Sequence, residues 1–178
     1  MKINFRNEQN RVSAYDPLEQ LVGDSGTGLL LSSGYFTAAH ELPFNRLLAG
    51  CSEVVVVVGH WSGHTKAEMD NKLRAFAEHV TQESNEFGFA RPTMKGYVVP
   101  HWHAKIAFKF HTFTQVVSTA LIGSSNISES ALAMSPQVFN IECDVLLDAG
   151  DGPDVAFELS MMRDGVFGVL AKYVPLVL

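Results

Sequence analysis

Five consecutive valines, Val54 to Val58, constrain the fold of this chain more than any other feature of its sequence. β-Branched residues favour strands, and an apolar strand without polar alternation is typical of the interior of a parallel sheet. We therefore expect a strand over residues 53–59 that is buried on both faces. A long helix is predicted next, over residues 65–83, because Thr65 can serve as its N-cap and Glu68 can complete a capping box.

Further strands and helices alternate along the rest of the chain. The sequence predicts a helix over 17–21, a strand over 28–36, a helix over 41–49, strands over 94–99, near 103–110, over 116–122 and near 138–147, and a closing helix over 154–173. Such alternation is typical of an α/β sandwich with a mixed central sheet flanked by helices. The length of 178 residues predicts a single domain over 1–178.

Composition narrows the class of protein and its partners. With 47% hydrophobic and 18% charged residues, the chain is typical of a globular protein. The valine run is too short to span a bilayer and the first residues lack an apolar core, so we expect a cytoplasmic protein with no membrane partner. Cys51 and Cys143 are predicted to be buried thiols. The net charge of −6 argues against strong DNA binding through bulk electrostatics.

Two short motifs carry the residue types that phosphoryl chemistry needs. His103 and Lys105 lie at the start of an alternating segment, where they would share one strand face. The strand over 116–122 then opens into Gly123-Ser124-Ser125-Asn126. A histidine can attack phosphorus, while Lys105, Ser124 and Asn126 can hold phosphate oxygens. A turn from a strand to a helix also offers free backbone N–H groups to a phosphate.

A third element, Asn140-Ile141-Glu142, places an acid inside an apolar strand. By alternation, Asn140, Glu142 and Asp144 share one face. A buried carboxylate needs a partner, and a histidine would be a suitable one. The alternative is that this strand face is simply exposed to solvent.

Taken in order, these motifs resemble the phospholipase D superfamily. His103 and Lys105 match H-x-K, Gly123, Ser124 and Asn126 match G-S-x-N, and Glu142 matches the acid of N-x-E. Phe110 stands where the family has an aspartate, and the gaps between motifs are longer than usual. These departures point away from the lipases and towards divergent nucleases, including metal-independent restriction endonucleases of the phospholipase D type.

The resemblance implies a fold, an activity and partners. It implies a phospholipase D-like α/β sandwich that hydrolyses DNA without a metal or other cofactor, through a covalent phosphohistidine at His103. Glu142 would orient His103, and Lys105, Ser124 and Asn126 would bind the phosphate. Because the chain holds one H-x-K motif and the family uses two, a homodimer is implied. The abrupt apolar ending at Leu178 adds the expectation of a separate DNA-recognition domain, and helper subunits are compatible with it.

Other interpretations remain open at the level of sequence. His60, Trp61 and His64 follow the valine strand, where loops often contact substrate, and we expect them to line the site entrance. Alternatively, His60, His64, His101 and His103 would bind zinc in a metal-dependent hydrolase. A phospholipase or another phosphodiesterase of the same superfamily, and a catalytically silent scaffold, are further alternatives.

Overall fold

The computed structural model of this protein describes residues 1–6, 18, 21, 27–34, 44–60, 63–124 and 142–178. Its elements are β1 (Lys2–Arg6), β2 (Gly28–Ser33), α2 (Phe44–Leu48), β3 (Glu53–His60), α3 (Lys66–Phe87), β4 (Thr93–Pro100), β5 (Lys105–Phe110), β6 (Val117–Gly123), β7 (Glu142–Asp148), the 3-10 turn η2 (Ala149–Asp151), α5 (Pro153–Leu170) and β8 (Leu176–Val177).

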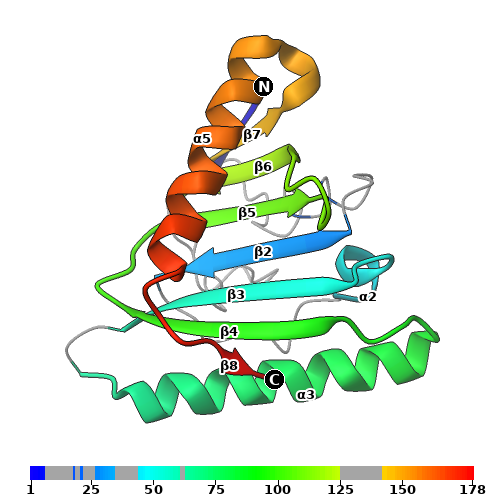
Figure 1. The fold of residues 1–178 in the computed structure, drawn as a ribbon, viewed down its shortest axis with the longest axis vertical. Coiled ribbons are helices and arrows are strands. Elements are labelled where there is room, and N and C mark those ends of the chain that lie inside the picture. The colour runs from blue at the N-terminus through cyan, green and yellow to red at the C-terminus, as the bar shows by residue number, and fades with distance from the viewer. Residues whose placement is uncertain (7–17, 19–20, 22–26, 35–43, 61–62, 125–141) are drawn as a thin grey trace.

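One mixed sheet organises the part of the chain that the structure describes. Its eight strands follow the order β1-β7-β6-β5-β2-β3-β4-β8. β2, β3 and β4 run parallel, and every other neighbouring pair is antiparallel. α5 crosses in front of the sheet in Figure 1, while α2 and α3 contribute side chains to the opposite face. The predicted mixed α/β architecture is therefore confirmed.

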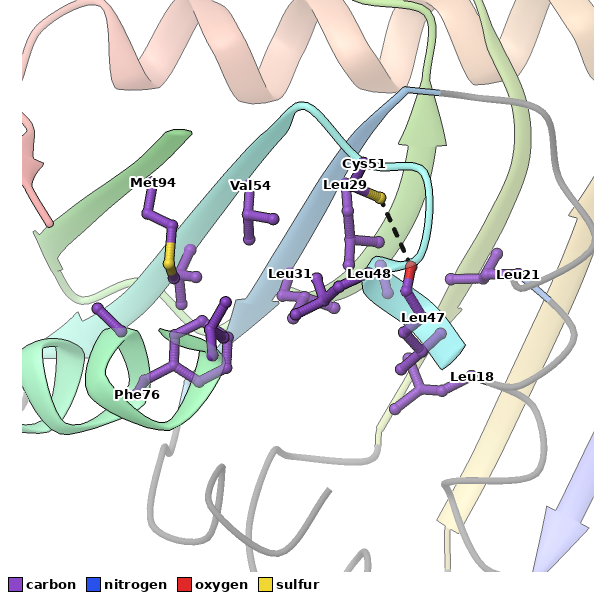
Figure 2. Packing of buried hydrophobic residues seen from close by; sticks show 14 of the residues in the cluster. Leu18, Leu21, Leu29, Leu31, Leu47, Leu48, Cys51, Val54, Phe76 and Met94 are labelled. Atoms are coloured by element: carbon purple, nitrogen blue, oxygen red, sulfur yellow. Dashed lines mark hydrogen bonds between the residues drawn. The ribbon is translucent and has the colours of Figure 1, made fainter. Parts of the chain in front are cut away.

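The two faces of the sheet bury two separate hydrophobic clusters. On the face of α2 and α3, Leu29, Leu31 and Val54 pack with Phe76 and other side chains (Figure 2). On the face of α5, the other sides of β2, β3 and β5 pack against the helix. All five valines of β3 are buried, because helices cover the strand from both faces. Each fully buried side chain of this size contributes about 1.5–3 kcal/mol to the hydrophobic driving force.

Aromatic rings hold α5 against the middle of the sheet. Phe108, Phe110 and Phe167 make edge-to-face contacts, with ring centroids 5.7–6.3 Å apart. Phe108 and Phe110 are fully buried on the face of β5 that alternation predicts. Lys109, on the opposite face of the same strand, is also buried, with 1% of its surface exposed. Burial of that lysine is not evident from the local pattern of the strand.

The predicted boundaries of α3 and α5 agree with the structure at their starts and differ at their ends. Thr65 caps α3 and Glu68 completes the capping box, as predicted. The helix continues to Phe87 because no breaker occurs before Gly88, which adopts the left-handed conformation at φ 71°. α5 ends at Leu170 rather than at residue 173. Residues 41–43, and most of the helix predicted over 17–21, lie outside the described residues.

Two edge strands and one cysteine differ from the sequence-based expectations. β1 pairs with β7 and β8 pairs with β4, and no strand was predicted at either place. The residues of β1 do alternate between polar and apolar over five positions, whereas β8 is only two residues long. Neither cysteine forms a disulfide, and Cys51 donates to the carbonyl of Leu47 over 3.5 Å (Figure 2). Cys143 is exposed, so the prediction that both thiols are buried is wrong. Cys143 is the second residue of β7 and pairs with β1, the outermost strand on that side of the sheet, so it lies close to the sheet edge.

None of the described helices combines the length and the apolar character that crossing a membrane requires.

Candidate active site at one edge of the sheet

The sheet topology brings the candidate residues to one edge. The carboxyl ends of β2, β3, β4 and β6 meet there with the amino ends of β5 and β7. His60, Lys105 and Glu142 each lie at the end of a strand at this edge, and Ser124 directly follows β6. Residues that are up to 82 positions apart, 60 and 142, are thus placed along one side of the sheet.

His103 and Lys105 converge at this edge. The alternation predicted that His103 lies in the strand. β5 begins at Lys105, however, so His103 precedes it. Their side chains nevertheless meet: the Nζ atom of Lys105 lies 2.6 Å from Nε2 and 3.1 Å from Nδ1 of His103. An ammonium group only donates hydrogen bonds, so it can interact with a neutral imidazole nitrogen. The exposed imidazole of His103 and the half-buried lysine therefore form a compact pair within reach of a ligand.

The second motif begins directly beside the first. Lys105 and Gly123 are cross-strand partners in the β5–β6 ladder. Ser124, the next residue, donates its backbone N–H to the carbonyl of Cys143 over 3.1 Å, and its hydroxyl oxygen accepts from the Cys143 N–H over 2.9 Å. Ser124 therefore joins the end of β6 to the start of β7. Asn126 lies outside the described residues.

β7 carries two acids at this edge, Glu142 and Asp144, and the sequence analysis selected only Glu142 as a site residue. Glu142 starts the strand and pairs with Arg6, but its side chain is outside the described part of the structure. Asp144 is 5% exposed and lies directly opposite Gly123. A Cβ atom added to Gly123 would be only 1.8 Å from Oδ1 of Asp144, so the carboxylate occupies the space that a side chain at 123 would fill. The row Lys105–Gly123–Asp144 thus runs across three strands.

The end of β2 holds the H-x-K segment from the other side. The buried hydroxyl of Ser32 donates to the carbonyl of Ala104 over 3.0 Å and accepts from the N–H of Ile106 over 3.1 Å. The indole of Trp102 donates to the same Ala104 carbonyl over 3.1 Å. Sequence reasoning missed Ser32, because a serine near a strand end carries no signal without knowledge of its neighbouring strand.

Of the three residues predicted to line the site entrance, His60 and His64 lie in the described part of the structure. His60 ends β3, and its carbonyl accepts from the N–H of His101 over 3.1 Å. His101 has a positive φ of 59° and thereby turns the chain towards His103. His64 precedes the cap of α3, with Nδ1 4.0 Å from the Glu68 carboxylate. Trp61 lies outside the described residues.

All four histidines of the alternative zinc site are described, but they do not form one. Within the described residues, no group of three or more His, Cys, Asp or Glu side chains is arranged to hold a metal ion. Among those residues, the structure therefore shows no set of ligands that would support the alternative zinc site.

A cavity of about 520 Å³ lies elsewhere on the molecule. Its lining comes from α3, the segment before β4 and the end of the chain, and comprises Arg74, Ala77, Glu78, Thr81, Gln82, Arg91, Val177 and Leu178. No candidate residue lines it.

Comparison with known proteins finds similarity only among solved structures. The sequence matches no protein-family model, and no curated protein matches it. A mutant of yeast tyrosyl-DNA phosphodiesterase is similar over 83% of this chain and 32% of its own, with 11% sequence identity and a TM-score of 0.43. A second structure of the yeast enzyme covers 82% of this chain and 32% of its own, with 11% identity and a TM-score of 0.41. This chain thus spans about a third of the length of those structures. Similarity at this level assigns no function, which must be argued from the residues themselves.

Proposed function

We propose that this protein is a metal-independent phosphodiesterase that cleaves DNA through a covalent phosphohistidine at His103. The observation that carries the proposal is the convergence of His103 and Lys105 beside the strand end that leads into Gly123 and Ser124. A nucleophile, a cation and the Ser124 hydroxyl, which can still donate its proton, then occupy one edge of the sheet. In this proposal residues 1–178 form a single phospholipase D-like nuclease domain.

In the first step, a ring nitrogen of His103 attacks phosphorus, and a P–N bond forms as the bond to the leaving oxygen breaks. The Lys105 ammonium stabilises the negative charge that builds on the non-bridging oxygens, because it is already positioned next to the nucleophile. Ser124 and Asn126 donate further hydrogen bonds to the same oxygens. Glu142 accepts a hydrogen bond from the second ring nitrogen, which fixes the tautomer of the nucleophile and stabilises the charged ring.

In the second step, water attacks the phosphohistidine and the P–N bond breaks. This releases the product phosphate and restores the imidazole. The covalent route divides one difficult displacement into two easier ones. The leaving oxygen of the first step needs a proton, and the same group can later take a proton from the attacking water.

The proton donor is the His103 of a second copy in this proposal. The motif occurs once in residues 1–178, and in this proposal a second copy of the chain supplies the other histidine through an isologous dimer with the site on its two-fold axis. His103 is exposed at the edge of the sheet, which is compatible with such a shared site.

Beyond the chemistry, we propose that the substrate is DNA and that the role is restriction. A net charge of −6 gives the domain little general affinity for DNA, so binding would depend on a separate recognition domain. The acidic charge, together with the departures from the phospholipase D pattern, is our reason for proposing the nuclease domain of a restriction endonuclease. A lipid phosphodiester would require the same chemistry, and substrate tests distinguish the two.

Cleavage of plasmid and single-stranded DNA in excess EDTA tests the proposal. The wild type, His103→Ala and His111→Ala would be compared, because His111 follows the opposite end of β5 and serves as a matched control. We expect the wild type and His111→Ala to cut in EDTA and to form a base-stable, acid-labile phosphoenzyme. His103→Ala should lose at least about 10³-fold in rate. Cleavage abolished by EDTA, or retained by His103→Ala, would overturn the mechanism, and turnover of phospholipid vesicles alone would overturn the DNA assignment.

A further inference from the structure

Ser32, at the end of β2, makes hydrogen bonds on both sides of Lys105. Its hydroxyl donates its proton to the carbonyl of Ala104 and accepts the N–H of Ile106. Ser32 is 4% exposed, so water does not readily replace either bond. One side chain thus fixes the backbone immediately before and immediately after Lys105.

Gly34 lies two residues further along and supports His103. A Cβ atom at Gly34 would be 2.8 Å from Cδ2 of the His103 ring, 3.3 Å from its Cα and 3.4 Å from the carbonyl oxygen of Trp102. The imidazole therefore packs directly over the glycine backbone. A side chain at 34 would displace the ring, because real Cβ atoms essentially never approach a neighbour that closely.

We propose that the end of β2 positions the His103–Lys105 pair, with Ser32 and Gly34 as positioning residues. This inference rests on the proposed function and adds residues that the H-x-K motif does not contain. His103 precedes β5, so the regular β-ladder does not hold it. The hydroxyl of Ser32 and the open surface of Gly34 supply that restraint.

The two functions of the Ser32 hydroxyl determine how variants should behave. Threonine can both donate and accept, whereas alanine can do neither. Ser32→Ala therefore removes both hydrogen bonds to the backbone beside Lys105, and Ser32→Thr retains them. Since a displacement of about 1 Å can cost about 100-fold in rate, we expect Ser32→Ala to lower kcat by about 10- to 100-fold and to change KM by less than about threefold.

Ser52→Ala is the matched control for this serine. The exposed hydroxyl of Ser52 donates to the carbonyl of Thr27 over 3.2 Å at the opposite end of β2, so its variant removes a serine hydroxyl bond far from Lys105. Gly28→Ala is the control for Gly34→Ala. A Cβ atom at Gly28 would lie 2.3 Å from the Phe110 ring. Gly28→Ala and Gly34→Ala therefore both introduce a close contact at an end of β2, but only Gly34→Ala crowds His103.

The experiment combines single-turnover DNA cleavage with amide hydrogen exchange of Ile106 and the NMR signals of the His103 ring. Ser32→Ala should accelerate exchange at Ile106 by at least about tenfold and slow cleavage, while Ser32→Thr and Ser52→Ala stay close to the wild type. Gly34→Ala should shift the His103 signals and slow cleavage far more than Gly28→Ala does.

Two results would overturn the positioning role. One is a Ser32→Ala variant with wild-type kcat and wild-type protection of Ile106. The other is a loss of rate that follows thermal stability equally in Ser32→Ala and Ser52→Ala. A wild type that cleaves no DNA would end the proposed function, but hydrogen exchange and the His103 signals would still decide whether β2 holds this segment.

Discussion

At the scale of single residues, the glycine of the G-S motif is explained by its neighbour across the sheet. Gly123 lies between Lys105 and Asp144, and the Asp144 carboxylate fills the space beside its Cα. A side chain at 123 would meet the Cα of Asp144 at 2.7 Å as well as the carboxylate, so backbone would have to move. Glycine is therefore required by packing, independently of any contact with substrate.

We expect Gly123→Ala to destabilise the fold by about 1–3 kcal/mol, the range typical of overpacked sites. Urea unfolding measures this change in the free energy of unfolding. Gly165→Ala is the comparison for an added methyl group that meets no neighbour: nothing lies within 4 Å of a Cβ atom built at Gly165, so this variant should not be destabilised. An unchanged stability of Gly123→Ala would contradict the packing explanation.

At the scale of elements, α3 depends on the cap that its sequence predicts. The Thr65 hydroxyl accepts from the N–H of Glu68 over 3.2 Å, and the Glu68 carboxylate accepts from the N–H of Thr65 over 2.5 Å. The hydrogen bond from the Thr65 backbone is the largest cause that lowers the pKa of Glu68, followed by the Thr65 side chain and the nearby charge of His64. The carboxylate form is thus favoured in the folded state.

This pKa shift gives a pH-dependent prediction for Glu68→Ala. A lowered pKa in the folded state means that the carboxylate contributes stability above its unfolded pKa, and that the contribution disappears as the pH falls through the folded pKa. The wild type should therefore be more stable than Glu68→Ala at pH 7, and the difference should shrink below about pH 4. Thermal unfolding over this pH range measures it. A difference that persists at pH 2 would show that the contribution does not come from ionised Glu68.

α5 contains two glycines that packing does not require, so substitution there should stabilise the protein. A Cβ atom built at Gly165 or Gly168 meets nothing within 4 Å. Alanine has a higher helix propensity than glycine, so each Gly→Ala change should stabilise the protein by about 0.5–1 kcal/mol. Chemical denaturation of the two single variants tests this. Destabilisation by either variant would indicate that its glycine serves a contact outside the described residues.

At the scale of the whole molecule, the proposed chemistry needs two copies of the chain. One copy supplies a single His103, and the mechanism uses one histidine as nucleophile and a second as acid. A dimer with one wild-type and one His103→Ala subunit should therefore be almost inactive, and not half as active as the wild type.

Co-expression of two differently tagged subunits and tandem purification would isolate this mixed dimer. Light scattering gives the mass of each species, and a pair of wild-type subunits with the same tags is the control for activity. A monomeric mass for the active protein, or half the wild-type rate for the mixed dimer, would contradict the shared site.

The sequence alone determined those features that depend on local patterns. The valine run predicts β3, the pair Thr65 and Glu68 predicts the start of α3, and alternation predicts the buried face of β5. These predictions succeed because burial period, capping and β-propensity act over a few neighbouring residues. The H-x-K and G-S motifs can be recognised in the same way, since each is short.

Only the tertiary structure decided which residues from distant parts of the chain meet. Pairing across strands placed Gly123 beside Lys105, Asp144 opposite Gly123, and Ser32 against the backbone around Lys105. It also decided that β1 and β8 pair with β7 and β4 at the two edges of the sheet. Such contacts depend on register between segments that are far apart in sequence, and local propensity carries no information about that register.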